Sequence, residues 1–453
     1  MIKNGRELAW LTLNRIETEQ AYASLALQAV LAENAGADQR EKAFCTELVY
    51  GTLRWLLKLD FMLGRLLNRP LNSLPPAVKN VLRLALYQIV FLTAIPERAV
   101  CHSTVELVKR SRFRGLAGLV NGVLRNFLRN QAGYELPDRR QDLAAYLEVA
   151  YSHPRWLVER WLQRFGAAQT ETILQVNNQR PPLTVRLKQP ATFGETTLAT
   201  LRREGFKFNS GKWLPEALNL TELPRALEAS TAFRRGWLTP QDESSMLVAH
   251  LLNPLPDELI IDLCAAPGGK STHLAELMHD RGRIISLDDH PHKVNLIKEN
   301  ACRLNLTAVE AVVGDARHFR LPENQQADAV LVDAPCSGTG VLRRRVDARY
   351  RRRPQDLVQL ADLQREILDQ AATLVKPQGR LVYSTCTLEP EENQKQIEWF
   401  LRNHPEFELA DYRAYLPGRL PNYLEVPDQR WITLIPVPDG GDGFFICRFN
   451  RLK

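Results

Sequence analysis

The sequence lacks long apolar segments, regularly spaced cysteines and stretches of low complexity. Its most apolar stretch, Leu84–Ile95, is well short of the roughly 20 residues that a membrane-spanning helix needs, so we expect no membrane partner. The first twenty residues carry charges of both signs and no continuous apolar core, which is not the pattern of a secretory signal. The seven cysteines include no CxxC pair and no His/Cys cluster at zinc spacing. We therefore predict a cytoplasmic protein with reduced thiols and without a metal.

What the chain does have is an ordinary globular composition with a basic balance. It is 453 residues long, 45% hydrophobic and 25% charged, and this length suggests about three domains of ~150 residues each. Lys and Arg total 59 against 52 Asp and Glu, a formal net charge of +7. The excess favours a polyanionic partner, although many soluble enzymes are equally basic.

Apolar residues at helical spacing dominate the first 135 residues. They recur over residues 40–68, 76–89 and 119–128, and Pro76 opens the second of these predicted helices. This pattern, with the segment VNGVLRNFLR (120–129), resembles the helical RNA-binding domain of NusB-type antitermination factors over roughly residues 3–130. Basic residues surround the last two predicted helices: Lys109, Arg110, Arg112, Arg114, Arg125 and Arg129. They form either a solvated face or an RNA-contacting surface.

Residues 136–235 are predicted to hold linker helices and a small α+β unit, following a polar break at 131–140. Helical segments at 154–165 and 167–177 precede an alternating strand, LTVRLK (183–188), and a short helix at 195–203. The basic residues of this region either track a phosphate backbone or are ordinary surface charge: Arg186, Lys188, Arg202, Arg203 and Lys207.

From residue 236 to 453, short apolar runs alternate with helix-length segments. The runs are LIIDLC (259–264), RIISLD (283–288), AVEAVV (308–313), ADAVLVD (327–333) and GRLVYST (379–385). This alternation predicts an α/β domain with a parallel sheet covered by helices on both faces. Ligands bind such sheets at the carboxyl ends of the strands. Each motif that carries chemistry in this sequence comes at the end of one of these runs.

The first run leads into DLCAAPGGKS (262–271), which is predicted to open a helix. Its small residues allow the backbone to approach a ligand closely: Ala265, Ala266, Gly268 and Gly269. The segment is not a phosphate-binding P-loop, because Cys264 occupies the position of the leading glycine and Pro267 removes an N–H donor. A dinucleotide GxGxxG motif is also absent.

Carboxylates follow the next two runs. Asp288 ends the second run, eighteen residues past Lys270, where it could accept both ribose hydroxyls of an adenosine. Asp315 follows the third run, where it could accept a hydrogen bond from the adenine amino group. Asp289 is expected to point to the opposite face. One aspartate after a strand is usually a turn residue. Aspartates after three successive strands, here Asp262, Asp288 and Asp315, indicate a binding site.

Two cysteines follow the fourth and fifth runs. Cys336 lies in DAPCSGTG (333–340) and Cys386 in STCT (384–387). A single cysteine at a strand end is usually a small buried apolar residue. Two of them beside hydroxyl residues at the same rim favour nucleophilic chemistry. Their spacing does not distinguish which one attacks.

Together with GDA (314–316), PEEN (390–393) and DGFFICR (442–448), these motifs resemble those of the Sun/Fmu-type ribosomal RNA cytosine-5 methyltransferases. With the NusB-like front half, the resemblance spans nearly the whole chain. It implies a Rossmann-like domain that uses S-adenosyl-L-methionine to methylate C5 of a cytosine in 16S rRNA. Addition of a thiolate to C6 of the base makes the otherwise unreactive C5 able to accept a methyl group.

The resemblance also implies the roles of individual residues. The cysteine of the TCT motif, Cys386, is the nucleophile, and that of the DAPC motif, Cys336, assists release of the methylated product. Cofactor binding falls to Cys264, Ala265, Ala266, Pro267, Gly268, Gly269, Lys270, Asp288, Asp315 and Asp333. Asp333 is also placed to reach the target base.

One segment departs from the family pattern. Arg345-Val346-Asp347 stands where the family usually carries a His-Pro-Asp-like triplet, and seven arginines lie between Arg343 and Arg353. These arginines either grip RNA phosphates or form a solvated loop, and we favour the RNA interpretation.

The predicted protein is a monomer with three domains and 16S rRNA as its partner. The domains are an all-helical NusB-like RNA-binding domain (1–135), linker helices with a small α+β RNA-binding unit (136–235) and a Rossmann-like methyltransferase domain (236–453). A DNA cytosine-5 methyltransferase and a non-catalytic rRNA-binding assembly factor are the alternatives. An exocyclic-amine methyltransferase is disfavoured, because DAPC replaces its Asp/Asn-Pro-Pro-aromatic motif.

Overall fold

The computed structural model describes residues 4–130, 135–188, 192–322, 325–416, 430–438 and 440–453, and their contacts divide the chain into two units. The helical unit comprises Met1–Gln179 and Arg345–Arg351. The sheet unit comprises Arg180–Arg344 and Arg352–Lys453. The first four residues of the predicted polar break, 131–134, lie outside the described residues. Among the described helices, none combines the length and the apolar character that crossing a bilayer requires.

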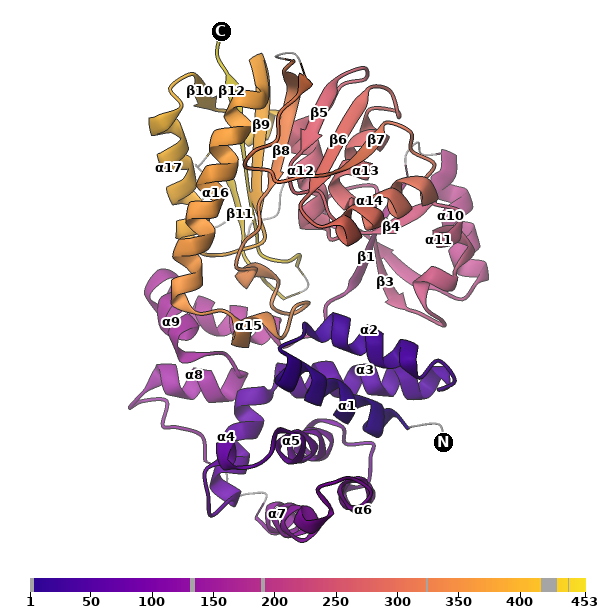
Figure 1. Ribbon diagram of the computed structural model, residues 1–453, viewed down its shortest axis with the longest axis vertical. Helices are drawn as coiled ribbons and strands as arrows, with labels where there is room; N and C mark the ends of the chain where they lie inside the picture. The colour runs from indigo at the N-terminus through magenta and orange to yellow at the C-terminus, as the bar shows by residue number, and fades with distance from the viewer. Residues whose placement is uncertain (1–3, 131–134, 189–191, 323–324, 417–429, 439) are drawn as a thin grey trace. The chain divides into compact units, whose positions relative to one another are not determined.

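The helical unit contains the all-helical region predicted from the sequence (Figure 1). Its helices are α1 (Gly5–Glu19), α2 (Ala23–Glu33), α3 (Gln39–Arg54), α4 (Leu56–Leu66), α5 (Pro76–Phe91), α6 (Glu97–Lys109), α7 (Ala117–Arg129), α8 (Leu143–Tyr151), α9 (Arg155–Asn177) and the short α15 (Ala348–Arg351). Pro76 opens α5 as predicted, because the first turn of a helix leaves its N–H groups unpaired in any case. The stripe predicted over 40–68 forms two helices, separated by non-helical backbone at Trp55. Gly166, with a φ of 75°, separates the two predicted halves of α9.

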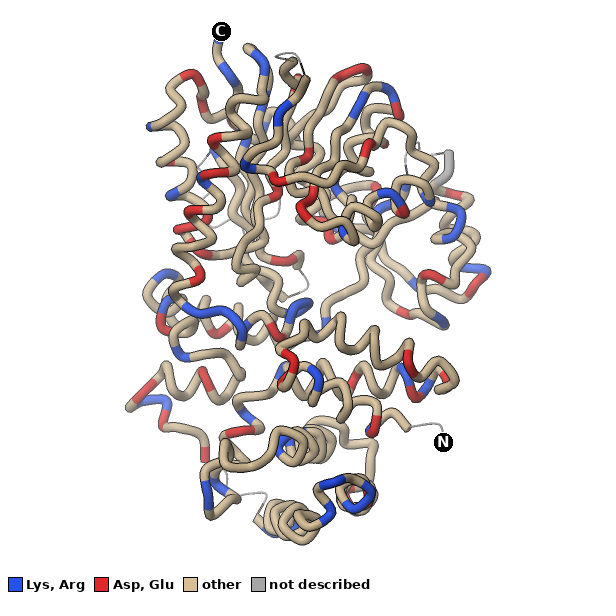
Figure 2. The backbone as a smooth tube through the Cα atoms, viewed as in Figure 1, with Lys and Arg blue, Asp and Glu red and all other residues tan. Residues whose placement is uncertain are grey.

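The basic residues predicted around the last two helices lie on and between α6 and α7, where Figure 2 shows Lys and Arg gathered. We call these residues the α6–α7 basic face: Lys109, Arg110, Arg112, Arg114, Arg125 and Arg129. All six are exposed. The apolar side chains of the same helices, including Val108, Val120 and Leu124, are buried in the core of the unit. The two helices therefore bury one face and leave the basic one to solvent.

The sheet unit begins with a small antiparallel sheet in the order β2-β3-β1-β4. Its elements are β1 (Leu183–Leu187), α10 (Thr192–Arg203), β2 (Lys207–Ser210), β3 (Ala217–Glu222), α11 (Thr231–Arg234) and β4 (Leu238–Pro240). The strand predicted at 183–188 and the helix predicted at 195–203 correspond to β1 and α10. The small α+β unit expected in this region is therefore present.

The remainder of the sheet unit is a larger mixed sheet covered by helices. Its elements are α12 (Glu243–Leu252), β5 (Leu259–Asp262), α13 (Gly269–Leu277), β6 (Arg283–Asp288), α14 (Pro291–Arg303), β7 (Val309–Val313), β8 (Ala327–Asp333), α16 (Pro354–Leu374), β9 (Val375–Thr385), α17 (Gln394–Asn403), β10 (Phe407–Leu409), β11 (Ile432–Leu434) and β12 (Phe444–Arg451). Within the described residues its order is β10-β12-β9-β8-β5-β6-β7, with β11 paired to β12. The strands from β5 to β9 are parallel and correspond to the five predicted runs.

The predicted parallel sheet is present, and three antiparallel strands that were not predicted extend it. Strand β12 runs antiparallel beside β9, and β10 and β11 run antiparallel to β12. Side chains of the parallel strands alternate between the two faces, as a period of two residues requires. Ile260 packs with α12 and α13, whereas its neighbour Ile261 packs with α16 and α17. The helices of both faces can be followed in Figure 1.

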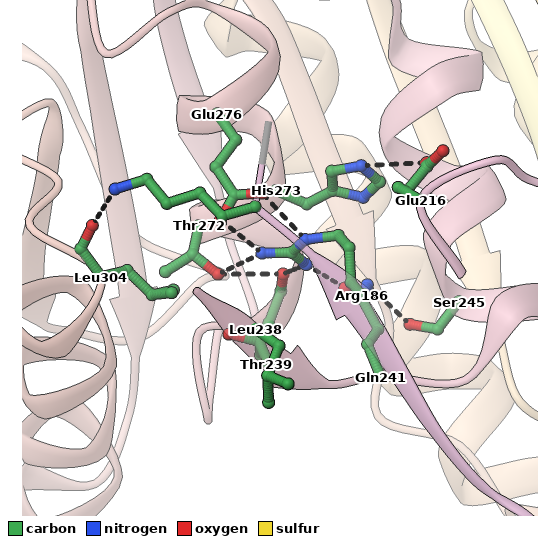
Figure 3. Close-up of polar contacts among 12 residues, drawn as sticks. Arg186, Glu216, Leu238, Thr239, Gln241, Ser245, Thr272, His273, Glu276 and Leu304 are labelled. Atoms are coloured by element: carbon green, nitrogen blue, oxygen red, sulfur yellow. Dashed lines mark hydrogen bonds and ion pairs between the residues drawn. The ribbon is translucent and has the colours of Figure 1, made fainter. Parts of the chain in front are cut away.

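Arg186 of β1 joins the small sheet to the larger one (Figure 3). Its side chain is 1% exposed, and Nε and Nη2 donate to the two carboxylate oxygens of Glu276 on α13, at 3.1 and 3.2 Å. Nη1 also donates to the carbonyl of Gly269 at 2.9 Å, at the start of α13. The ammonium of Lys188 donates to the carbonyl of Leu304. Neither side chain therefore tracks a phosphate backbone, whereas Arg202, Arg203 and Lys207 are exposed.

We predict that Arg186→Ala destabilises the sheet unit by about 3–5 kcal/mol, because it leaves the carboxylate of Glu276 buried without its partner. Differential scanning calorimetry of the full chain should show the lost stability as a lower Tm. Arg203→Ala removes an exposed arginine of α10 and serves as the matched control, with an expected change within about 0.5 kcal/mol. Equal Tm values for the two variants would contradict the structural role of Arg186.

Candidate active site

All five parallel strands carry their motifs to one edge of the larger sheet, where backbone hydrogen bonds join their ends in pairs. The N–H of Ala265, after β5, donates to the carbonyl of Leu287 in β6 at 2.8 Å. The N–H of Gly314 donates to the carbonyl of Asp288 at 3.0 Å, which joins the ends of β6 and β7. The N–H of Ala334 donates to the carbonyl of Ser384 at 2.9 Å and joins β8 to β9. We call this edge the carboxyl rim.

The segment Cys264–Lys270 connects β5 to α13 in a tight turn. Gly268 has a φ of 97°, and its N–H donates to the carbonyl of Ala265 at 2.7 Å. A Cβ at Gly268 would also lie 3.2 Å from the Cα of Ile297, so glycine is required there for two reasons. A Cβ at Gly269 would meet no heavy atom within 4 Å. Open space therefore lies beside the start of α13, where a ligand could approach the backbone.

Beneath this turn lies Asp262, the last residue of β5. Its side chain is fully buried, and Oδ2 accepts a hydrogen bond from the hydroxyl of Ser271 at 2.7 Å. Burial raises the pKa of Asp262 to about 7, even though the Ser271 hydroxyl favours the charged form. Asp262 was not among the residues predicted to bind the cofactor.

The two carboxylates predicted to bind an adenosine are neighbours at the rim. Asp288 is almost buried, and its Oδ1 lies 3.1 Å from the ammonium of Lys293. Asp315 is part-exposed and pairs with Arg317, whose hydrogen bonds hold the pKa of Asp315 below its usual range. Asp289 is exposed, but the prediction that it points to the opposite face is wrong, because its Oδ1 lies 3.3 Å from the same Lys293 ammonium. Two carboxylates thus stand at the ends of neighbouring strands beside the Cys264–Lys270 turn, as acceptors for hydroxyl or amino groups.

Asp333 connects the turn after β5 to the motifs after β8 and β9. Its Oδ2 lies 2.6 Å from the ammonium of Lys270, and its Oδ1 accepts a hydrogen bond from the Ser384 hydroxyl at 2.7 Å. Lys270 also lies over the ring of Phe444 in β12, 5.3 Å from its centroid. A chain of polar contacts therefore runs from the candidate cofactor loop to the strand that precedes Cys386.

The two predicted cysteines face each other across the ends of β8 and β9. The sulfur atoms of Cys336 and Cys386 are 3.4 Å apart, and both residues are part-exposed. The hydrogen bond with Cys386, followed by burial, raises the pKa of the Cys336 thiol well above its usual range. The structure thus brings together the two thiols that lie 50 residues apart in the sequence. It leaves their individual roles open.

A buried carboxylate, Glu392, holds the two cysteine loops together. Its side chain accepts hydrogen bonds from the Ser337 N–H at 2.8 Å and from the Thr387 hydroxyl at 2.9 Å, one residue beyond each cysteine. The amide of Gln364 donates to it at 3.1 Å. Burial raises the pKa of Glu392. Glu392 lies in the PEEN motif (390–393). The acidic composition of that motif does not reveal that one of its carboxylates is buried between the two cysteine loops.

Close backbone packing fixes the same loops from the other side. The N–H of Gly340 donates to the carbonyl of Cys386 at 3.0 Å, and the N–H of Gly443 donates to the carbonyl of Gly340 at 2.8 Å. A Cβ at Gly340 would lie 2.3 Å from the Gly443 carbonyl oxygen, so no larger residue fits. The DGFFICR motif therefore supports the cysteine-bearing loops.

The arginines from Arg343 to Arg353 were predicted to bind RNA phosphates. Most of them instead form ion pairs or hydrogen bonds with other groups of the protein. Arg343 and Arg344 both pair with the buried carboxylate of Asp442. Arg349 is 1% exposed and donates to main-chain carbonyls. Arg351 and Arg352 also donate to carbonyl groups. These side chains are therefore structural, because carbonyl and carboxylate oxygens already occupy their donors.

Two clusters among the described residues place potential metal-ligating atoms within 4.8 Å of one another: Glu216, His250 and His273, and Asp288, Asp289 and His290. In the first, His250 Nε2 lies 2.5 Å from Glu216 Oε1. His273 Nε2 lies 3.6 Å from the same oxygen, and Figure 3 shows these two side chains. Two ligands of one tetrahedral zinc ion, each about 2.0–2.1 Å from it, are about 3.3 Å apart. The 2.5 Å contact is a hydrogen bond, and His290 and Asp289 form a similar contact in the second cluster.

Family models match three parts of the chain. Residues 249–450 match the model described as 16S rRNA methyltransferase RsmB/F, and residues 3–129 match the NusB family. Residues 153–225 match the ferredoxin-like domain of RsmF/B-like methyltransferases. The NusB-like and methyltransferase domains expected from the sequence are thus confirmed.

Curated relatives align over almost the full length. A protein of Bacillus subtilis named "probable ribosomal RNA small subunit methyltransferase B" is 42% identical over 98% of both chains. A protein of the same name from Synechocystis is 35% identical over 99% of both. Among solved structures, that of PH0851 is 26% identical and superposes with a TM-score of 0.81 over 100% of both chains. A methyltransferase homologue from Pyrococcus horikoshii is 28% identical, with a TM-score of 0.58 over 68% of this chain and 98% of that one.

We predict that Glu392→Ala loosens both cysteine loops, whereas Glu392→Gln largely preserves them. Alanine leaves the buried Ser337 N–H without an acceptor, which costs about 1–3 kcal/mol. Glutamine keeps one acceptor for that N–H and turns its amide towards the hydroxyl groups. Alkylation rates of Cys336 and Cys386 by iodoacetamide, measured by mass spectrometry, should rise for the alanine variant and stay near wild type for glutamine. Equal rates in all three proteins would show that Glu392 does not hold the loops.

The raised pKa of Asp262 predicts a pH-dependent stability. The folded protein keeps a proton until about pH 7, whereas the unfolded chain releases it from about pH 4. This contribution to stability is therefore fully present below pH 4 and is lost as the pH rises to about 7. Asp262→Asn removes the titration, so its Tm relative to wild type should be higher at pH 8 than at pH 5. A Tm difference that is independent of pH would contradict the assignment.

Proposed function

The chain belongs to the family of ribosomal RNA small subunit methyltransferases B, and from that premise we propose that it methylates C5 of a cytosine in 16S rRNA through a covalent bond between Cys386 and C6. The pair of sulfur atoms 3.4 Å apart at the carboxyl rim carries this proposal. A methyl transfer to a nucleophilic oxygen or nitrogen would need neither thiol. Cytosine C5 is different, because it becomes nucleophilic only after another group has added to C6.

The residues of the rim fit S-adenosyl-L-methionine. When bound, this cofactor supplies an electrophilic methyl group. The glycine turn at Gly268 and the open space beside Gly269 leave the backbone accessible, and carboxylates at the next strand ends can accept the hydroxyl and amino groups of an adenosine. In this proposal the cofactor-binding residues are those between Cys264 and Lys270, with Asp288, Asp315 and Asp333. Asp333 would keep Lys270 oriented and hold the end of β9 beside it.

The cysteines would act in sequence on the base. The Cys386 thiolate adds to C6, and the electron pair displaced from the C5–C6 double bond allows C5 to take the methyl group. Transfer of the proton on C5 to solvent water then restores the C5–C6 double bond and expels the Cys386 thiolate, which breaks the S–C6 bond. Cys336, whose pKa is raised, assists this release from 3.4 Å away. No step requires a metal ion, and one chain carries every group, so we propose a monomer.

The substrate surface in this proposal includes the helical unit. The six exposed cations of the α6–α7 basic face suit a phosphate backbone, and their contribution to affinity should weaken with salt. Cytosine in folded rRNA is stacked, so the base must be flipped out to bring C6 to the sulfur. Contacts with the surrounding RNA would offset the cost of this unstacking.

We predict that Cys386→Ala abolishes methyl transfer, whereas Cys336→Ala traps a protein–RNA adduct that survives denaturant. Without Cys386 no S–C6 bond forms, and without Cys336 the bond forms but breaks slowly. Denaturing electrophoresis with labelled rRNA separates the two outcomes. An adduct with Cys386→Ala and none with Cys336→Ala would exchange the two roles.

The substrate is tested by incubating the protein with labelled cofactor and total rRNA, with duplex DNA as the parallel sample. Bisulfite sequencing of 16S rRNA should then show one protected cytosine. Label in the DNA alone would favour a DNA methyltransferase. RNA binding without cofactor binding in calorimetry would favour a non-catalytic assembly factor.

A further inference from the structure

The chain between β8 and α16 leaves the sheet unit and returns to it within a few residues. Arg345–Arg351 belongs to the helical unit, although the residues on either side belong to the sheet unit. We call Arg345–Arg351 the seated segment. Val346 is fully buried in the core of the helical unit, and the carboxylate of Asp347 accepts a hydrogen bond from the N–H of Ala23 at 3.1 Å, at the start of α2. A negative charge is favourable at the start of a helix, where N–H groups are unpaired.

Arg349 anchors the seated segment at the ends of three helices. Its guanidinium donates to the carbonyl of Arg54 at the end of α3, of Ser152 at the end of α8 and of Asn177 at the end of α9, at 3.1–3.3 Å. The last carbonyl groups of a helix lack partners within it and carry a partial negative charge. A fully buried arginine that satisfies three such ends fixes the segment in one position.

The seated segment ends beside a residue that holds the Cys336 loop. Arg351 donates to the carbonyl of Ala21 at 2.9 Å within the helical unit. The next residue, Arg352, donates from Nη2 to the carbonyl of Cys336 and from Nε to that of Ser337, both at 3.2 Å, within the sheet unit. One peptide bond therefore separates an arginine fixed in the helical unit from an arginine that holds the catalytic loop.

We propose that Arg352, the residue that follows the seated segment, is a positioning residue for Cys336. The Cys336–Ser337 backbone is then held from two sides, since Glu392 accepts the Ser337 N–H and Arg352 donates to the two carbonyls. The planar guanidinium suits this task because its donors reach two oxygens at once. The inference rests on the proposed role of Cys336 in product release. It assigns Arg352 to the release step instead of to RNA binding.

The test compares Arg352→Ala with Arg353→Ala, an adjacent exposed arginine whose backbone N–H is bound by Asp356 and stays in place after substitution. Arg352→Ala should lower kcat by between about tenfold and a hundredfold, the range expected for a misplaced catalytic group, and should accumulate the denaturant-resistant adduct. The KM for rRNA and its salt dependence should remain those of wild type. Arg353→Ala should match wild type in kcat and should accumulate no adduct.

Arg352→Lys keeps the charge but loses the simultaneous hydrogen bonds to two carbonyl oxygens, so it should accumulate adduct to an intermediate level. This variant also provides the test if the alanine variant does not fold. Two results would overturn the inference. One is a higher KM with a salt slope reduced by about one in both Arg352→Ala and Arg353→Ala, which indicates phosphate contacts. The other is a wild-type kcat without adduct in folded Arg352 variants.

Cys336→Ala serves as the reference that separates the inference from the proposed function. If Cys336→Ala traps no adduct, the proposed role of Cys336 fails whatever the Arg352 variants do. If Cys336→Ala traps adduct and the Arg352 variants do not, only the positioning role fails.

Discussion

The geometry of the candidate active site depends on one buried carboxylate, that of Glu392. A carboxylate that is removed from water must find donors within the protein, and it finds them one residue beyond each of the two cysteines. The two loops therefore share an acceptor and cannot shift independently without leaving a buried polar group unpaired. The shared acceptor therefore keeps the two loops close together, with the sulfur atoms 3.4 Å apart.

The sheet unit supplies the rest of the site by bringing short segments to one edge. Parallel strands place their carboxyl ends together, and Asp333 turns that proximity into contact by binding both Lys270 and Ser384. The small sheet contributes Arg186, which binds the carbonyl of Gly269 at the start of α13 and the carboxylate of Glu276 in the same helix. The loop after β5 is thus fixed at the end where α13 begins, a useful property for a loop whose backbone must meet a ligand.

Much of this arrangement could be predicted from the sequence because its signals are local. The five parallel strands are short apolar runs, and the aspartates and cysteines that follow them are within a few residues of each run. Strands β10 to β12 were missed, because they do not alternate with helices and gain their stability by pairing with β9 and with one another. The individual roles of the two cysteines remain a prediction, since their geometry is nearly symmetrical.

The charged residues were the hardest to interpret, because charge in a sequence does not show what it faces. In the sequence, Arg186 and Arg349 resemble surface residues. In the fold, Arg186 binds Glu276, 90 residues away, and Arg349 binds the carbonyl of Arg54, 295 residues away. Glu392 lies in an acidic segment typical of an exposed loop, yet it is buried. Each of these contacts is long-range, so no local pattern of residues could indicate it.

The discontinuity of the helical unit affects how the protein is made. During synthesis the first 179 residues leave the ribosome long before Arg345–Arg351 have been added. Until then the nascent bundle lacks Val346 in its core and the guanidinium that satisfies carbonyl groups at three helix ends. The amino-terminal bundle can therefore be completed only after most of the second unit has been translated. A fragment that stops at Gln179 is missing a piece of its own interior.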